Sequence, residues 1–131
     1  MFESYYEIAR KYQNLLLHDE RKLITQAKRG KISAKQELIL YQIGFFLFRI
    51  NTMLYPPIRK QYGEDILHEC MKYALERVSS YNLRYRNKSG KFQPVYFRTY
   101  LWKGVTGVII SSVKKRKEIC FSDISHFESC I

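Results

Sequence analysis

The most constraining feature of this sequence is an apolar segment at residues 34–54. Read as a helix, it carries large apolar side chains around most of its circumference, from Leu38 to Phe48. A helix of this kind is stable in water only when other helices surround it. Pro56 and Pro57 follow it and end it, because proline disfavours helical backbone in the residue before it. We therefore expect a helical bundle built around residues 34–54.

Further helices are predicted where apolar residues recur every three or four positions. We expect them at residues 2–17, between Asp19 and Gly30, at 64–78 and at 95–117. Asp19 is the expected N-cap of the second helix, Gly30 its C-terminal glycine, and Ser33 the start of a capping box for the central helix. Residues 57–62 predict a short turn that Gly63 ends, and residues 80–94 a loop, because Ser, Asn, Gly and Pro favour turns.

No segment of the sequence has the two-residue period of a strand, and none repeats. The expected fold class is therefore all-α, a compact bundle of about five helices. A chain of 131 residues suffices for one domain with a core, which we place at residues 1–118, with residues 119–131 as a flexible tail.

Composition narrows the class of protein. Apolar residues make up 46% of the chain, which favours folding over disorder. The longest apolar run, residues 43–48, is far shorter than the roughly 18 residues that cross a membrane, and we see no signal peptide. Three cysteines without a CxxC pair indicate reduced thiols, so we expect a cytoplasmic protein.

Charge is concentrated in the C-terminal part of the sequence. The formal net charge is +11, which predicts a polyanionic partner such as nucleic acid or an anionic membrane surface. Residues 81–117 contain ten basic residues, seven aromatic residues and no acidic residue. Cations that follow a phosphate backbone, interleaved with rings that stack bases, are typical of proteins that bind single-stranded nucleic acid. Some of these aromatic residues could instead belong to the hydrophobic core, and Phe97 is the strongest candidate for that. The basic run at 114–117 could instead be a solvated helix end, where positive charge is favourable.

A second charged surface is predicted on the helix at residues 64–78. Asp65, His68, Glu69 and Lys72 share one face because they follow the helical spacing of three and four residues. No catalytic motif accompanies them: Lys72 stands where a zinc-protease motif needs its second histidine, and no glycine precedes Ser89-Gly90-Lys91 at the P-loop spacing. We expect a binding protein rather than an enzyme, without metal or cofactor.

Three segments, in this order, resemble region 2 of bacterial sigma-70 family sigma factors, and are most similar to the extracytoplasmic-function-like branch. Residues 23–30 (LITQAKRG) resemble the family's opening motif, and residues 64–81 (EDILHECMKYALERVSSY) its core-binding helix. Residues 97–101 (FRTYL), followed by a helix with a basic end, resemble its promoter-binding helix. The resemblance covers about residues 19–118. It implies the sigma domain 2 fold and a role in transcription initiation.

The resemblance also implies which residues bind. The β′ clamp of the RNA polymerase core would contact Asp65, His68, Glu69 and Lys72. The non-template strand of the −10 promoter element would contact Tyr81, Asn82, Tyr85, Arg86, Tyr96, Arg98, Tyr100, Trp102 and Lys103. Phosphates would also bind the basic helix end, formed by Lys114, Lys115, Arg116 and Lys117. A separate −35-binding subunit or an anti-sigma factor would be a further partner.

The sequence departs from the family at three places. His68 replaces the usual glutamine, Lys103 and Gly104 stand where larger members have two tryptophans, and no segment after residue 118 predicts a −35-reading helix-turn-helix. Two other functions stay open. A general single-strand-binding module would not need the acidic face, and a clamp-binding regulator that reads no DNA would not need the rings. Membrane binding ranks last because no apolar face accompanies the basic tail.

Overall fold

The computed structural model describes residues 3–13 and 15–120. In this part of the chain there are six α-helices and no strand beyond an isolated bridge between Arg86 and Phe92. The helices are α1 (Glu3–Lys11), α2 (Leu17–Lys28), α3 (Ile32–Leu40), α4 (Ile43–Met53), α5 (Pro56–Arg77) and α6 (Phe97–Cys120). The predicted all-α bundle is confirmed.

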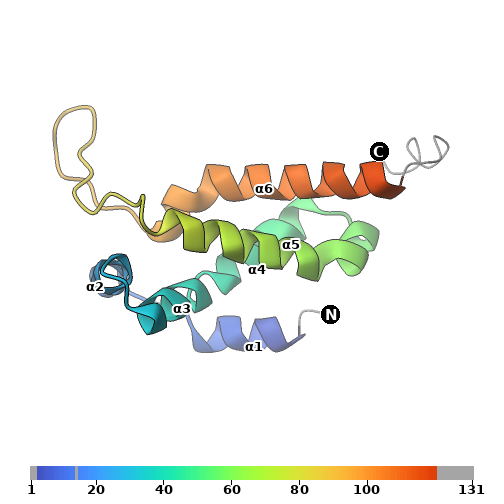
Figure 1. Ribbon diagram of the computed structural model, residues 1–131, viewed down its shortest axis with the longest axis horizontal. Coiled ribbons are helices and arrows are strands. Elements are labelled where there is room, and N and C mark those ends of the chain that lie inside the picture. Colours follow the sequence, from blue (N-terminus) through green and yellow to red (C-terminus); the bar gives the residue numbers. More distant parts are fainter. Residues whose placement is uncertain (1–2, 14, 121–131) are drawn as a thin grey trace.

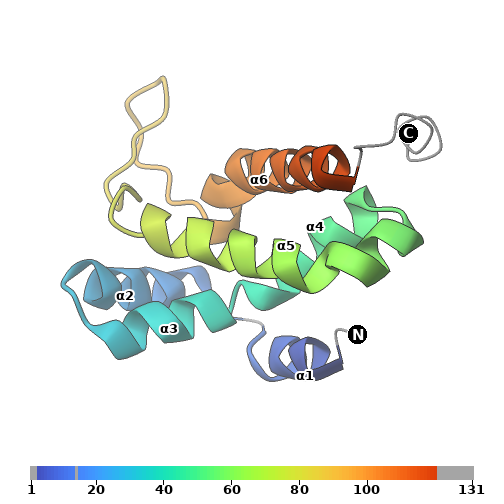
Figure 2. The ribbon, with the colours of Figure 1, turned by 45° about the vertical axis from the view of Figure 1, so that its right-hand side comes forward.

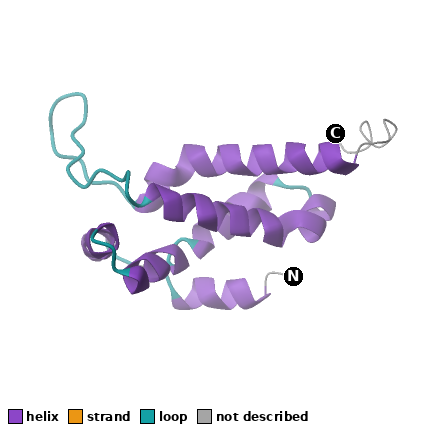
Figure 3. Cartoon of the chain, in the orientation of Figure 1, coloured by secondary structure: helices purple, strands orange, loops and turns teal. Residues whose placement is uncertain are grey.

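The two longest helices, α5 and α6, run antiparallel side by side, and α4 packs against both (Figures 1 and 2). The hairpin of α2 and α3 closes one end of the bundle, and α1 lies against α4. The long connection between α5 and α6 extends past the bundle as a loop (Figure 3). Completely buried residues of α2 to α6 form the core, among them Ile24, Leu38, Phe46, Ile66 and Phe97. The α4 part of the apolar segment therefore lies at the centre, whereas its α3 part packs with α2 at one end.

The structure corrects the prediction of one continuous central helix. The segment is interrupted at Tyr41 and Gln42, which separate α3 from α4. The backbone forms a tighter, 3₁₀-like turn there, because the backbone N–H of Gln42 donates to the carbonyl of Ile39, three residues earlier, at 2.9 Å. Gln42 itself is buried, 2% exposed, and its side chain donates to the Leu38 carbonyl at 3.2 Å. A buried amide side chain needs polar partners, and the break places Gln42 among them.

Several predicted helix ends also differ from the structure. The helix expected at residues 64–78 begins already at Pro56, because a proline in the first turn lacks only an N–H that has no helical partner there. Gly63 is buried inside it instead of ending a turn. The first helix ends at Lys11 rather than at residue 17, and the last begins at Phe97 rather than at residue 95 and continues to Cys120.

The predicted caps have mixed outcomes. Asp19 lies in the first turn of α2 rather than at its N-cap, which is Leu16. Ser33 lies inside α3, whose N-cap is Lys31, so the capping box is not formed. Gly30 is confirmed as the C-terminal glycine of α2, with a φ of 92° that favours glycine. Residues 121–131, most of the predicted tail, lie outside the described residues.

Replacing each of two glycines of α6 by alanine should change the free energy of unfolding in opposite directions. A Cβ at Gly104 would overlap the ring of Tyr73 from α5, whereas a Cβ at Gly107 would meet no atom within 4 Å. Alanine favours helix over glycine by about 1 kcal/mol. We expect Gly107→Ala to raise the free energy of unfolding by about 0.5–1 kcal/mol and Gly104→Ala to lower it by up to about 2 kcal/mol, because overpacking outweighs propensity. Urea denaturation of both variants measures this, and equal stabilisation would contradict the close contact with Tyr73.

Candidate nucleic-acid and protein interfaces

A buried polar cluster fixes the start of α6. Glu20 of α2 is only 3% exposed, and its Oε1 accepts a hydrogen bond from the Phe97 backbone N–H at 2.6 Å. The Gln42 side chain also hydrogen-bonds to Glu20. Burial raises the pKa of the Glu20 carboxyl above 4.5, although these hydrogen bonds and the Arg98 charge favour its ionised form. Glu20 thus caps α6 from another helix and sets the position of its first turns.

The sequence interpretation did not single out Glu20 or Gln42. The available signal was a polar residue on an apolar stripe, because Glu20 precedes Ile24 by four positions and Ala27 by seven. All three are buried on α2. A carboxylate in such a position requires a donor, but which donor it meets depends on the tertiary fold.

Two cations of α2 hold the first part of the loop between α5 and α6. Lys28 Nζ donates to the Tyr81 carbonyl at 2.5 Å and to the Ser79 carbonyl at 3.2 Å. Arg21 Nη2 donates to the Leu83 carbonyl at 2.6 Å, and its guanidinium carbon lies 5.1 Å from the centre of the Phe92 ring. These cations therefore serve the loop backbone rather than a ligand.

The outer part of the loop is a small hairpin with an exposed basic tip. The side-chain oxygen of Asn87 accepts hydrogen bonds from the Ser89 and Lys91 backbone N–H groups at 2.9 and 3.0 Å. Gly90 has a φ of 78°, and its carbonyl accepts a hydrogen bond from Arg86 at 3.0 Å. The exposed cations of this loop are Arg84, Arg86, Lys88 and Lys91, of which Arg86 is the one that donates to Gly90. Because the tip extends past the bundle, a long polyanion can approach it freely (Figure 1).

The structure corrects the expected role of Tyr81 in strand binding. Tyr81 is only 2% exposed, and its hydroxyl donates to the Val95 carbonyl. The ring packs edge-on against Phe97 and Tyr100, with centroid distances of 5.8 and 5.4 Å. Burial raises the pKa of its phenol. In this structure Tyr81 has no free ring face for a base. Its ring instead packs against that of Tyr100.

Tyr85 and Tyr100 remain partly open, at 45% and 37% exposed. They line a hollow of about 320 Å³, which we call the loop hollow. Its other lining residues are Ser80, Tyr81, Asn82, Val95 and Thr99. The Tyr100 ring stacks on Phe97 at 6.1 Å, and its hydroxyl lies 2.7 Å from that of Ser80. Rings and small polar groups at one concave site are the features that bind an unpaired base.

Of the remaining predicted strand-binding residues, Arg86 lies in the loop tip, Tyr96 immediately precedes α6, and the others lie on the first turns of α6. The Arg98 guanidinium lies over the Tyr96 ring at 4.1 Å, so one face of that ring is covered. Trp102 is 43% exposed, and contacts Phe45 of α4 with centroids 5.5 Å apart. Lys103 is exposed to solvent. Apart from Arg86 at the loop tip, the predicted set thus lies on or next to the first turns of α6, and its exposed members Asn82, Tyr85 and Tyr100 line the loop hollow.

The predicted acidic face is only partly free. Asp65, His68 and Lys72 are exposed on α5. Glu69 faces α6 instead, where its Oε1 lies 3.3 Å from Arg116 Nη2 and its Oε2 accepts from the Ser112 hydroxyl. Glu69 and Arg116 are thus already paired with each other in this structure, and their expected binding roles stay predictions. The side chains of Glu69 and Arg116 meet because α5 and α6 lie side by side.

The basic helix end is correspondingly smaller than predicted. Lys114 and Lys115 are exposed, whereas the Arg116 side chain is 16% exposed. The side chain of Lys117 lies outside the described residues. On α5, His68 Nε2 lies 2.7 Å from the Tyr5 hydroxyl, so α1 covers one edge of the charged face. The sequence did not predict this contact.

Comparison of the chain with protein-family models, with curated proteins and with solved structures finds no match. Over the residues that the structure describes, no helix is both long and apolar enough to cross a membrane. Nor do His, Cys, Asp and Glu side chains of these residues gather into a group of three or more that could hold a metal ion. The function must therefore be inferred from the surfaces themselves.

Proposed function

We propose that this chain acts as a sigma factor domain 2, which binds the β′ clamp of RNA polymerase core and holds the opened −10 strand of a promoter. The observation that carries the proposal is the loop hollow beside the basic loop tip. Tyr85 and Tyr100 offer ring surface there, and Arg84, Lys88 and Lys91 supply positive charge along the same loop. Such a combination suits a strand whose bases are unpaired.

The proposed role of the hollow is to stabilise a base that has left the duplex. Extruding a base costs a few kcal/mol, and one base–ring stack returns about 1–3 kcal/mol. The amide of Asn82 and the hydroxyls of Ser80 and Thr99 line the same hollow and can hydrogen-bond to a base edge. Because the Glu20 cap fixes the start of α6, Tyr100 is held in place before the strand arrives.

The proposed polymerase contact uses α5. Asp65 and Lys72 are exposed on the same face, while Glu69 is paired with Arg116. We therefore assign the docking charges to Asp65 and Lys72, with His68 at the edge covered by Tyr5. A helix face of mixed charge can dock on a second helix, such as one arm of a coiled coil.

Reconstitution with core polymerase tests this proposal. On a template whose −10 region is already unpaired, we expect transcription that depends on this chain and decreases at least fivefold in Tyr100→Ala, because about 1 kcal/mol of stacking is lost. Asp65→Ala should weaken core binding several-fold. The control is Glu37→Ala, which removes an exposed carboxylate of α3. Normal core binding and transcription by Asp65→Ala would overturn the docking role.

A general single-strand-binding function is the second candidate, favoured by the loop tip alone. It predicts equal affinity for any unpaired strand, with or without polymerase, and no effect of Asp65→Ala. Binding curves for −10-like and unrelated strands, with core polymerase present and absent, separate the two functions.

A further inference from the structure

The first helix, α1, lies against the face of α5 to which we assign the polymerase contact. The Tyr5 hydroxyl lies 2.7 Å from His68 Nε2, and the two rings meet edge-on with their centroids 6.0 Å apart. His68 lies between Asp65, three positions earlier, and Lys72, four positions later, so these residues follow one line along the helix. A helix that contacts both Asp65 and Lys72 must therefore cross the position that Tyr5 occupies.

Few contacts hold α1 on the bundle. None of its nine residues is buried. Tyr5, Ile8 and Ala9 are only partly buried where they pack against the core, and Asn51 of α4 donates a hydrogen bond to the Tyr6 hydroxyl at 2.7 Å. An isolated helix needs about 12–15 residues to be even marginally stable in water. The helical state of α1 therefore depends on these surface contacts.

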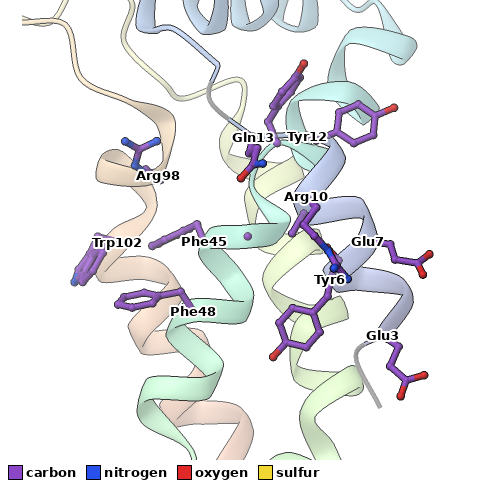
Figure 4. A pocket seen from close by; sticks show the side chains of 13 residues that line it. Glu3, Tyr6, Glu7, Arg10, Tyr12, Gln13, Phe45, Phe48, Arg98 and Trp102 are labelled. Carbon is purple, nitrogen blue, oxygen red and sulfur yellow. The ribbon is translucent and has the colours of Figure 1, made fainter.

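An open cleft separates part of α1 from the rest of the bundle (Figure 4). It lies between α1, α4 and α6 and has a volume of about 1010 Å³. Tyr6 and Arg10 line it from α1, and the exposed ring of Phe48 lines it from α4. A tightly packed helix leaves no such space, because protein interiors are packed as densely as organic crystals. Segments with few buried contacts are the ones that open most easily.

We propose that α1 is a displaceable cover of the polymerase-docking face, and that docking on α5 moves α1 away from His68. This inference rests on the proposed function and concerns the regulation of its docking site. In the free chain, only molecules whose α1 is displaced bind the clamp along the whole face. The apparent affinity for core polymerase is therefore the intrinsic affinity multiplied by the fraction of such molecules. Holding α1 in place lowers this affinity, and loosening α1 raises it.

A reversible disulfide tests whether α1 must move. A Cβ at Gly44 of α4 would lie 3.7 Å from the Cβ of Ala9, and disulfides join Cβ atoms about 3.5–4.5 Å apart. The full chain with Ala9→Cys and Gly44→Cys should therefore link α1 to α4 on oxidation. Cys120→Ser and Cys130→Ser remove two native thiols, and the third, Cys70, is buried. We expect the oxidised chain to bind core polymerase about tenfold more weakly than the same chain after reduction.

The control for the disulfide is the chain with Ala9→Cys alone, in the same background and under the same oxidation and reduction. It has no second thiol on α4, so its core affinity should change by less than about twofold. Thiol titration and urea denaturation check that the double variant is closed and folded. Equal core affinity of the closed and reduced forms would show that α1 need not move, and would overturn the cover.

A variant that loosens α1 should have the opposite effect. Tyr5→Ala removes the hydrogen bond and the ring contact to His68, and should raise core affinity about two- to fivefold. Glu7→Ala is its control on the same helix, because Glu7 is exposed and points away from α4 (Figure 4). It should change core affinity by less than about twofold. Weaker core binding by Tyr5→Ala would mean that α1 adds contacts to the polymerase, and contradicts a cover.

Hydrogen exchange of the natural chain provides a readout without substitutions. Binding of core polymerase should speed exchange of the α1 backbone amides and slow exchange in α5. If α1 exchanges equally in the free and bound chain, it is not displaced and the cover fails. If Asp65→Ala weakens core binding but the closed disulfide does not, the cover alone fails and the proposed function stands. If the natural chain does not bind core polymerase at all, the proposed function fails, and the cover with it.

Discussion

Glu20→Ala is expected to lower the free energy of unfolding by about 2–4 kcal/mol. Loss of a helix cap accounts for about 1 kcal/mol, and a buried N–H or amide left without its partner for a further 1–3 kcal/mol. The variant leaves both the Phe97 N–H and the Gln42 side chain without the carboxylate. Domains of this size are stable by only about 5–15 kcal/mol, so the loss is large, and urea denaturation measures it.

Glu20→Gln separates the cap from the charge. The glutamine oxygen can still accept from the Phe97 N–H, so this variant should keep most of the stability. Because the pKa of Glu20 is raised on folding, its contribution to stability is complete below pH 4.5 and is lost as the pH rises through the folded-state pKa. The stability of Glu20→Gln relative to the natural chain should therefore increase as the pH rises above 4.5. An unchanged difference over this range would contradict a raised pKa.

Removing the charges of the loop tip is expected to weaken strand binding more than any single substitution. The variant Arg84→Ala, Lys88→Ala, Lys91→Ala should lower affinity for single-stranded DNA roughly tenfold or more at low salt. It should also decrease the slope of log affinity against log salt by about 2, because each phosphate contact on a single strand contributes about 0.7. Titrations at several salt concentrations give both quantities.

The control for the loop variant is Arg29→Ala, Lys31→Ala, Lys60→Ala. It removes the same one arginine and two lysines from exposed positions outside the loop, so both variants lose three charges from the net +11. If general attraction were responsible, the two variants would weaken binding equally. If the loop tip holds phosphates, only the loop variant changes the salt slope.

Local sequence patterns predicted the helices and the loop, but not their ends. Each helix has a stripe of apolar residues that needs no distant partner to be recognised. The break at Tyr41 and Gln42 has no such signal, and the buried Gln42 there meets a carboxylate 22 positions earlier in the chain. Likewise, the start of α6 at Phe97 depends on Glu20, and no local pattern near residue 97 indicates it.

The sequence by itself determined that the chain is all-α, that one apolar segment supplies the centre of the bundle, and that a basic, ring-rich span includes the start of the last helix. These properties depend on residue type and spacing alone. Tertiary structure decided which of those residues are free. In the folded chain Tyr81 is buried against Tyr100, and Glu69 is paired with Arg116. Phe48 and Trp102, by contrast, are left exposed to solvent. The physical reason is that exposure and pairing depend on which helices lie side by side, and residues far apart in the chain carry no local signal of meeting.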